Sequence, residues 1–228
     1  MSNALQFGLT PKTKPLSPKR SALVAALDVG TSKIACLIAR LKPQAPQDAL
    51  RRRSHAVEVL GFGHTVARGM KAGAVVDLAE AEVAVRQALA QAERTAKMQL
   101  ESVVVSLSAG KPGSELMSAT VNVSGKTVTD SDIARVLSAC SQHSVRPGRV
   151  VLHSLPTGYS LDEARGIRDP RGMLGRRFGI DMHVMTSDIA VVRNLILAIE
   201  RCHLEVGALA ASPYVSGLAV LADDEADL

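Results

Sequence analysis

Aromatic residues are scarce in this chain: its 228 residues include no tryptophan, two tyrosines and three phenylalanines. Proteins that bind single-stranded nucleic acids commonly stack the bases on aromatic side chains. The chain has little material for such a platform, so we expect no nucleic-acid partner of this kind. Its core must be aliphatic, in keeping with a hydrophobic content of 46%.

Cysteines are also few, and no metal-binding spacing is present. Cys36, Cys140 and Cys202 are far apart and lie in apolar segments, a pattern that predicts buried, reduced thiols in the cytoplasm. The six histidines show no HxxxH or HExxH spacing, so the histidines suggest no metal site. No apolar run reaches the roughly 18 to 20 residues of a spanning helix, and prolines and lysines interrupt the N-terminal segment where a signal peptide would be apolar. We therefore expect a cytoplasmic protein.

The excess of positive charge is confined to the N-terminal part of the chain. The formal charge is +5, yet residues 1–53 carry ten Lys and Arg against two Asp, which leaves 17 basic and 20 acidic residues in the rest. A surface that recruits a polyanion normally lies on a folded face, whereas this excess lies in a proline-rich tail and one loop. We expect residues 1–21 to form a disordered basic arm.

The order of apolar segments predicts an α/β protein interrupted by a small α+β unit. Before the interruption, two short apolar runs flank a tight turn, a third strand follows, and then come a long amphipathic helix over 78–98 and a strand over 100–107. The small unit has the order strand, helix, strand, strand. After it, the pattern predicts a helix over 188–203, a strand over 206–211 and a helix over 213–222.

The turn after the first strand carries the residues best suited to binding phosphate. Gly30 lets backbone N–H groups approach a phosphate, Thr31 and Ser32 add hydroxyl donors, and Lys33 can neutralise charge. Asp28, at the end of the strand, could hold a hydrated Mg²⁺. On spacing alone, a plain type I′ or bulged hairpin turn explains this segment as well.

Residues 27–33 resemble the first phosphate loop of the actin-like ATPases, and later segments resemble one branch of them, the FtsA family of bacterial cell-division proteins. The matching segments follow in family order over nearly all of the expected folded chain; they include residues 61–63, 68–70, 73–77, 149–153, 166–170 and 200–204.

The resemblance implies a fold and a domain organisation. Residues 22–108 together with 184–228 would form an actin-like, ribonuclease H-like subdomain (1A). Residues 109–183 would form an inserted SHS2-type subdomain (1C), which is a protein-interaction module in the family. The family's second lobe and its C-terminal membrane-anchoring helix do not follow Leu228, so we expect a truncated sequence.

The resemblance also implies a function. The chain would be part of an ATP- and Mg-binding adaptor that self-associates into actin-like polymers, binds FtsZ through the second lobe, and recruits late division proteins through residues 109–183. It would lie on the cytoplasmic face of the inner membrane at the division site.

Hydrolysing relatives place a Glu or Gln near the start of the last helix, where this chain has Ala211, Ser212, Pro213 and Tyr214. We therefore assign no catalytic residue and expect a weak ATPase at most. Two alternatives stay open: a pilus-assembly scaffold similar to PilM, and a true actin- or chaperone-type ATPase.

Overall fold

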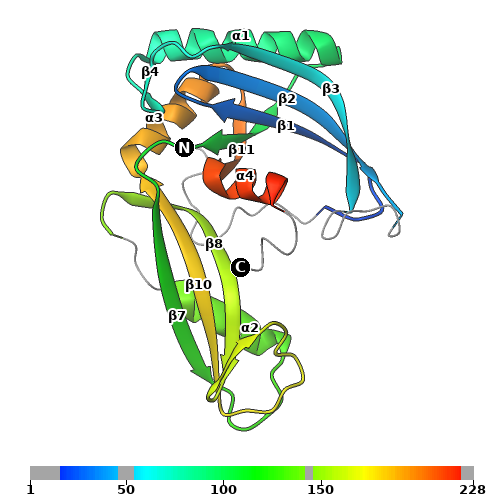
Figure 1. Ribbon diagram of the computed structural model, residues 1–228, viewed down its shortest axis with the longest axis vertical. Coiled ribbons are helices and arrows are strands. Elements are labelled where there is room, and N and C mark those ends of the chain that lie inside the picture. The colour runs from blue at the N-terminus through cyan, green and yellow to red at the C-terminus, as the bar shows by residue number, and fades with distance from the viewer. Residues whose placement is uncertain (1–15, 46–53, 142–145, 222–228) are drawn as a thin grey trace. The chain divides into compact units, whose positions relative to one another are not determined.

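The computed structural model describes residues 16–45, 54–141 and 146–221, so most of the expected basic arm lies outside the described residues (Figure 1). Each helix that the apolar pattern predicts is present, and strands occupy the segments between the helices. The strands are β1 (Ala22–Val29), β2 (Lys33–Pro43), β3 (His55–Val66), β4 (Met70–Lys71), β5 (Ala74–Val75), β6 (Ser102–Leu107), β7 (Gly113–Asn122), β8 (Arg149–Leu161), β9 (Ala164–Ile167), β10 (Arg177–Asp188) and β11 (Glu205–Ala211). The helices are α1 (Leu78–Ala96), α2 (Asp130–Ser141), α3 (Ile189–Glu200) and α4 (Ser212–Val220).

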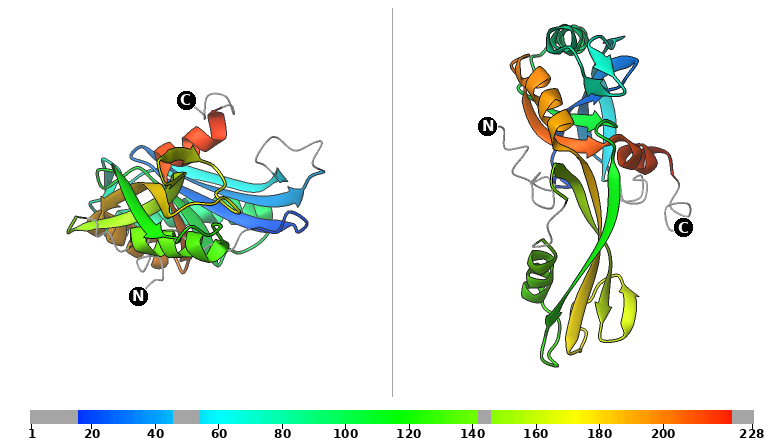
Figure 2. Two further views of the ribbon diagram at one scale, coloured as in Figure 1. Left: turned by 90° about the horizontal axis from the view of Figure 1, so that it is seen from below. Right: turned by 90° about the vertical axis from the view of Figure 1, so that its left-hand side faces the viewer.

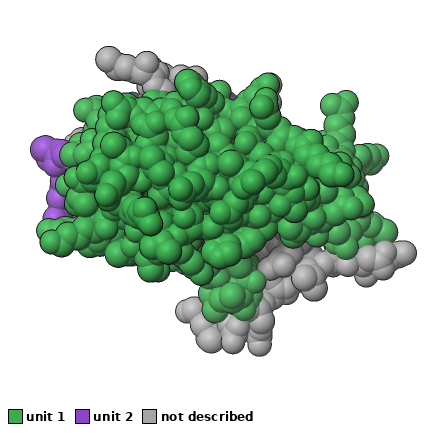
Figure 3. Space-filling model, turned by 90° about the horizontal axis from the view of Figure 1, so that it is seen from above, with its two compact units in different colours: residues 1–6, 11–111, 188–228 green, residues 7–10, 112–187 purple. Residues whose placement is uncertain are grey.

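The chain divides into two compact units (Figure 3). Among the described residues, unit 1 comprises 16–111 and 188–221, and unit 2 comprises 112–187. Each unit has its own sheet and its own buried core, and each is described separately below.

Unit 1 is built on a five-stranded mixed sheet with the order β11-β6-β1-β2-β3. β1, β2 and β3 form an antiparallel meander, while β6 and β11 run parallel to β1 and to each other. Side chains alternate along β1, so that Leu27 and Val29 are buried while Asp28 is exposed. This is the mixed α/β arrangement that the sequence predicts.

Helices α1 and α3 cover the face of this sheet to which Leu27 and Val29 point. Asp77 caps α1, as its position predicts, because its Oδ1 accepts a hydrogen bond from the N–H of Glu80 at 3.0 Å. The buried side of α1 is mostly alanine, which lets the helix lie directly against β3. Two glycines of β3 make this approach possible: a Cβ at Gly61 would lie 2.2 Å from the nearest backbone oxygen of α1, and one at Gly63 would lie 2.1 Å away.

Helix α4 contacts β6 and β11 and lies across the sheet from α1 (Figure 1). It is apolar on all sides, and yet none of its residues is buried. Leu218 is 59% exposed and Val220 is 78% exposed. A helix that is hydrophobic all round is normally buried, so this helix presents an unusual amount of apolar surface.

Unit 2 is a four-stranded sheet with the order β7-β10-β8-β9. β7 and β10 pair over ten consecutive residues, and the right-hand view of Figure 2 shows both as long, twisted strands. The core of the unit lies between the sheet and α2 and includes Phe178, Ile180 and Val136. The predicted order of strand, helix, strand, strand does not include β9, which pairs with β8 because Asp162, at φ 53°, reverses the chain immediately after β8.

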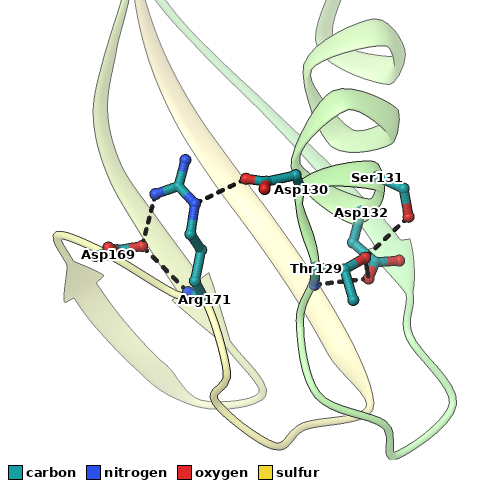
Figure 4. Close-up of polar contacts among 6 residues, drawn as sticks. All are labelled: Thr129, Asp130, Ser131, Asp132, Asp169 and Arg171. Carbon is teal, nitrogen blue, oxygen red and sulfur yellow. Dashed lines mark hydrogen bonds and ion pairs between the residues drawn. The ribbon is translucent and has the colours of Figure 1, made fainter.

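The Asp132 side chain ties the first turn of α2 to Thr129, the residue before the helix. Thr129 donates to Asp132 Oδ2 through its hydroxyl at 2.7 Å and through its backbone N–H at 3.0 Å. Beside it, Arg171 bridges Asp130 and Asp169 and so ties the start of the helix to the loop before β10 (Figure 4).

No helix in the described ranges is both long enough and apolar enough to cross a membrane.

Candidate functional site

Three parallel strands of unit 1 end at one edge of the sheet, and the predicted phosphate-binding residues lie there. Asp28 of β1 is in register with Ser106 of β6, and Ser106 is in register with Ala210 of β11. In open α/β sheets, ligands bind outside the carboxyl ends of the parallel strands. The edge is therefore the place where this fold would hold a ligand.

The loop from Gly30 to Lys33 closes the β1–β2 hairpin at that edge. The Gly30 N–H donates to the Lys33 carbonyl oxygen at 3.0 Å, and a Cβ at Gly30 would lie 2.9 Å from the same oxygen. The backbone of the loop is tied on its other side, where Ala67 N–H donates to the Ser32 carbonyl at 3.0 Å. The side chains of Thr31, Ser32 and Lys33 stay exposed, so two hydroxyls and one ammonium are presented by a fixed backbone.

The start of α4 adjoins the same edge. Ser106 Oγ and Ser212 Oγ are 2.8 Å apart, which joins the end of β6 to the first residue of the helix. No side chain caps the N-terminus of α4, and Pro213 stands in its first turn. The N-terminus of a helix carries a partial positive charge that favours anions. Because side chains alternate along a strand, Asp28 points to the face of Ser106, which is also the face of α4.

These positions bring all five predicted site residues to one edge, but they do not form a preassembled metal centre. No three His, Cys, Asp or Glu side chains gather anywhere in the described ranges. The strand register places the Asp28 carboxylate at this edge, where it could hold a hydrated Mg²⁺. A hollow of about 400 Å³ lies at the other end of the strands, lined in part by Leu100, Glu101 and Gly207, and it has no cluster of phosphate donors.

Ser106 and its contact with Ser212 were not foreseen from the sequence. The signal was present, since Ser106 is the one hydroxyl inside the otherwise apolar run from Val103 to Leu107. What the sequence does not show is the register that places this serine beside Asp28.

Other titratable groups are structural. His153 of unit 2 is buried, and burial lowers the pKa of its imidazole. The thiols of Cys36, Cys140 and Cys202 are buried and reduced, as predicted. Burial, together with the charge of Glu93, raises the pKa of Cys36 to about 11, which makes that thiol a poor nucleophile.

Comparison with known families identifies unit 2. The model of the SHS2 domain inserted in FtsA matches residues 110–186.

Comparison with curated proteins extends the match to the whole chain. The cell division protein FtsA of Agrobacterium fabrum is 47% identical over 222 residues, which is 97% of this chain and 50% of that protein. FtsA of Escherichia coli K12 is 32% identical over 206 residues, 90% of this chain and 47% of that protein. The chain thus spans about half the length of the curated relatives it matches.

Among solved structures, a chain of the PilM-PilN type IV pilus biogenesis complex aligns with a TM-score of 0.49 and 14% sequence identity, covering 86% of this chain and 49% of that one. A likeness at this level favours neither a pilus role nor a division role.

Proposed function

We propose that this chain is the nucleotide-binding and partner-recruiting part of a division adaptor. The chain belongs to the FtsA family of cell-division proteins and spans about half of their length. The observation that carries the proposal is the match to FtsA proteins along 97% of the chain. In the proposed role, the whole protein links the FtsZ ring to the cytoplasmic face of the inner membrane at the division site and recruits later division proteins.

In this proposal, ATP binds at the edge of the unit 1 sheet. Its phosphates lie against residues 30–33, where backbone N–H groups, two hydroxyls and the Lys33 ammonium supply donors and positive charge. Asp28 holds Mg²⁺ through a water molecule, and the N-terminus of α4 adds a favourable dipole. No carboxylate or amide stands at residues 211–214 to orient a water molecule, so turnover is slow and the bound nucleotide acts mainly as a conformational ligand.

The proposal needs a second lobe to close over the nucleotide. The exposed apolar surface of α4 supports this, and so do Val57 and Val59 of β3, which are 62% and 59% exposed. Contiguous exposed apolar surface of this kind usually marks an interface. The 228-residue chain alone should bind ATP feebly, because it supplies one side of the cleft; micromolar affinity in isothermal titration of this fragment would contradict the proposal.

We assign the recruitment of later division proteins to residues 109–183. They nearly coincide with the residues that match the inserted SHS2 domain, and unit 2 has a core of its own, as a separate interaction module requires. FtsZ binding, polymer formation and membrane attachment are assigned to the half of the relatives' length that lies outside this chain.

The longer reading frame and a pull-down test the proposal together. The protein encoded by the longer frame should contain a second Asp-x-Gly-x-Gly-Thr phosphate loop just beyond residue 228, and it should retain FtsZ in a pull-down while a pilus inner-membrane peptide is not retained. If the longer frame lacks this loop, the proposal that a second lobe closes over the nucleotide is wrong. Retention of the pilus peptide in place of FtsZ would favour the pilus scaffold.

A further inference from the structure

The sheet of unit 2 has a hollow on the face away from α2. Its volume is about 270 Å³. Hydroxyl residues of β7 and β8 line it, together with charged residues of β9, β10 and the turn between β8 and β9. These lining residues are Ser118, Thr120, Ser160, Asp162, Arg165, Arg177 and Asp181. The side chains of Ser160 and Thr120 lie close over Gly179 of the central strand β10. A Cβ there would lie 2.4 Å from Ser160 Oγ and 3.2 Å from Thr120 Cγ2.

Two guanidinium groups line this hollow, and the structure gives neither an ion pair within the described residues. Arg177 begins β10, and Arg165 lies on the edge strand β9; both are exposed. Arg171 of the neighbouring loop differs, because it is held between Asp130 and Asp169 at 2.7 and 2.9 Å (Figure 4). Arg165 and Arg177 therefore keep their forked donors available for a ligand.

The two carboxylates of the lining are engaged by donors of the protein itself. Asp162 Oδ1 accepts backbone N–H bonds from Arg176 at 3.0 Å and Arg177 at 2.8 Å. These bonds lower the pKa of Asp162 and fix the turn before β9. Asp181 Oδ1 accepts the hydroxyl of Ser118. Both acids serve to position the surrounding strands and turn, so the groups left to meet a ligand are guanidinium and hydroxyl donors.

We propose that this hollow binds a glutamate or aspartate side chain from an acidic, extended segment of a partner polypeptide. The guanidinium groups of Arg165 and Arg177 form ion pairs with the carboxylate, and the hydroxyls of Thr120 and Ser160 complete its hydrogen bonds. Charge complementarity decides the kind of partner, since Arg165 and Arg177 have no ion pair within the described residues, while Asp162 and Asp181 already accept hydrogen bonds from the protein. The inference rests on the proposed role of residues 109–183 as an interaction module and gives the chemistry of one partner.

The test uses the 228-residue chain and a short fluorescein-labelled peptide of alternating glutamate and serine, followed by fluorescence anisotropy. The Arg165→Gln/Arg177→Gln double variant should lose at least about tenfold in affinity, because hydrogen bonds to charged groups are among the stronger ones. The affinity of the Arg177→Lys variant should lie between those of the parent and the double variant, since lysine keeps the positive charge but not the forked donors of the guanidinium. Arg193→Gln on α3 removes one positive charge at an exposed site outside unit 2 and should bind like the parent.

A peptide with glutamine in place of glutamate should not bind. The inference would be overturned by equal affinity of the parent and the double variant, by equal affinity of the two peptides, or by a preference for a phosphoserine peptide or anionic vesicles. Both arginines are exposed, so circular dichroism should show the double variant folded. The assay needs no nucleotide and no second lobe, and its failure would leave the proposed ATP site untouched.

Discussion

Replacing Gly63 with alanine should destabilise unit 1 far more than a single methyl group suggests. The added Cβ would lie 2.1 Å from the backbone oxygen of Ala88 and 2.7 Å from the backbone nitrogen of Ala92. Neither atom can rotate away as a side chain could, so α1 must move off the sheet. The movement would loosen the contact between α1 and β3 along the alanine face of the helix.

The magnitude follows from two opposing effects. Overpacking in a core costs about 1 to 3 kcal/mol, and a clash with backbone on two sides belongs at the upper end of that range. Alanine has less backbone entropy than glycine in the unfolded chain, which stabilises the folded state by about 0.4 to 1 kcal/mol. A net loss of about 2 kcal/mol in the free energy of unfolding is expected, which for a chain of this size lowers the melting temperature by roughly 4 to 8 °C.

Urea denaturation followed by circular dichroism measures the change, with Gly207→Ala as the matched control. Gly207 also lies in a strand of the same sheet, but the nearest atom to its added Cβ is 3.7 Å away, so this variant should match the parent or gain slightly. If Gly63→Ala were as stable as Gly207→Ala, the close approach of α1 to β3 would be wrong.

Three further outcomes are expected. Asp77→Ala removes the cap of α1 and should cost about 1 kcal/mol of stability in thermal melts; an unchanged melting temperature would contradict the cap. Asp162 has a folded-state pKa below its usual value because it accepts backbone N–H bonds from Arg177 and Arg176. It therefore contributes stability that is present above its unfolded pKa of about 3.9 and is lost as pH falls through the folded value; Asp162→Asn should flatten acid unfolding below about pH 4, and an acid transition like the parent's would refute this. Cys36 should stay unmodified by a thiol reagent at pH 8 in the folded chain and react after denaturation, since burial raises its pKa to about 11; rapid labelling of the folded chain at Cys36 would contradict its burial.

The sequence predicts strands, helix starts and burial correctly where apolar spacing alone decides them. The alternation of Leu27, Asp28 and Val29 predicts a strand with one buried face, and the structure has it. Asp77 before an amphipathic run predicts the start of α1, and its carboxylate accepts the expected bond. The buried state of the three cysteines was predicted from the same apolar context.

The remaining features depend on contacts between distant residues. β9 has no apolar alternation and forms because Asp162 turns the chain and because β8 offers a partner. Ser106 reaches Asp28 only through the register of two parallel strands. The hollow lined by Arg165 and Arg177 requires neighbouring strands of unit 2 to lie side by side, and no local pattern marks it.

Equilibrium binding of ATP and Mg²⁺ to the full-length protein tests the central claim most directly. The parent should bind, and Lys33→Gln and Asp28→Asn should each weaken binding by about tenfold or more, since each removes a charge facing the phosphates or the metal. Lys42→Gln is the matched control, because Lys42 lies further along β2 in an ion pair with Glu58 at 3.0 Å, and it should bind like the parent. Equal ATP affinity in the parent and all three variants would contradict the assignment of the phosphate site to this edge of the sheet.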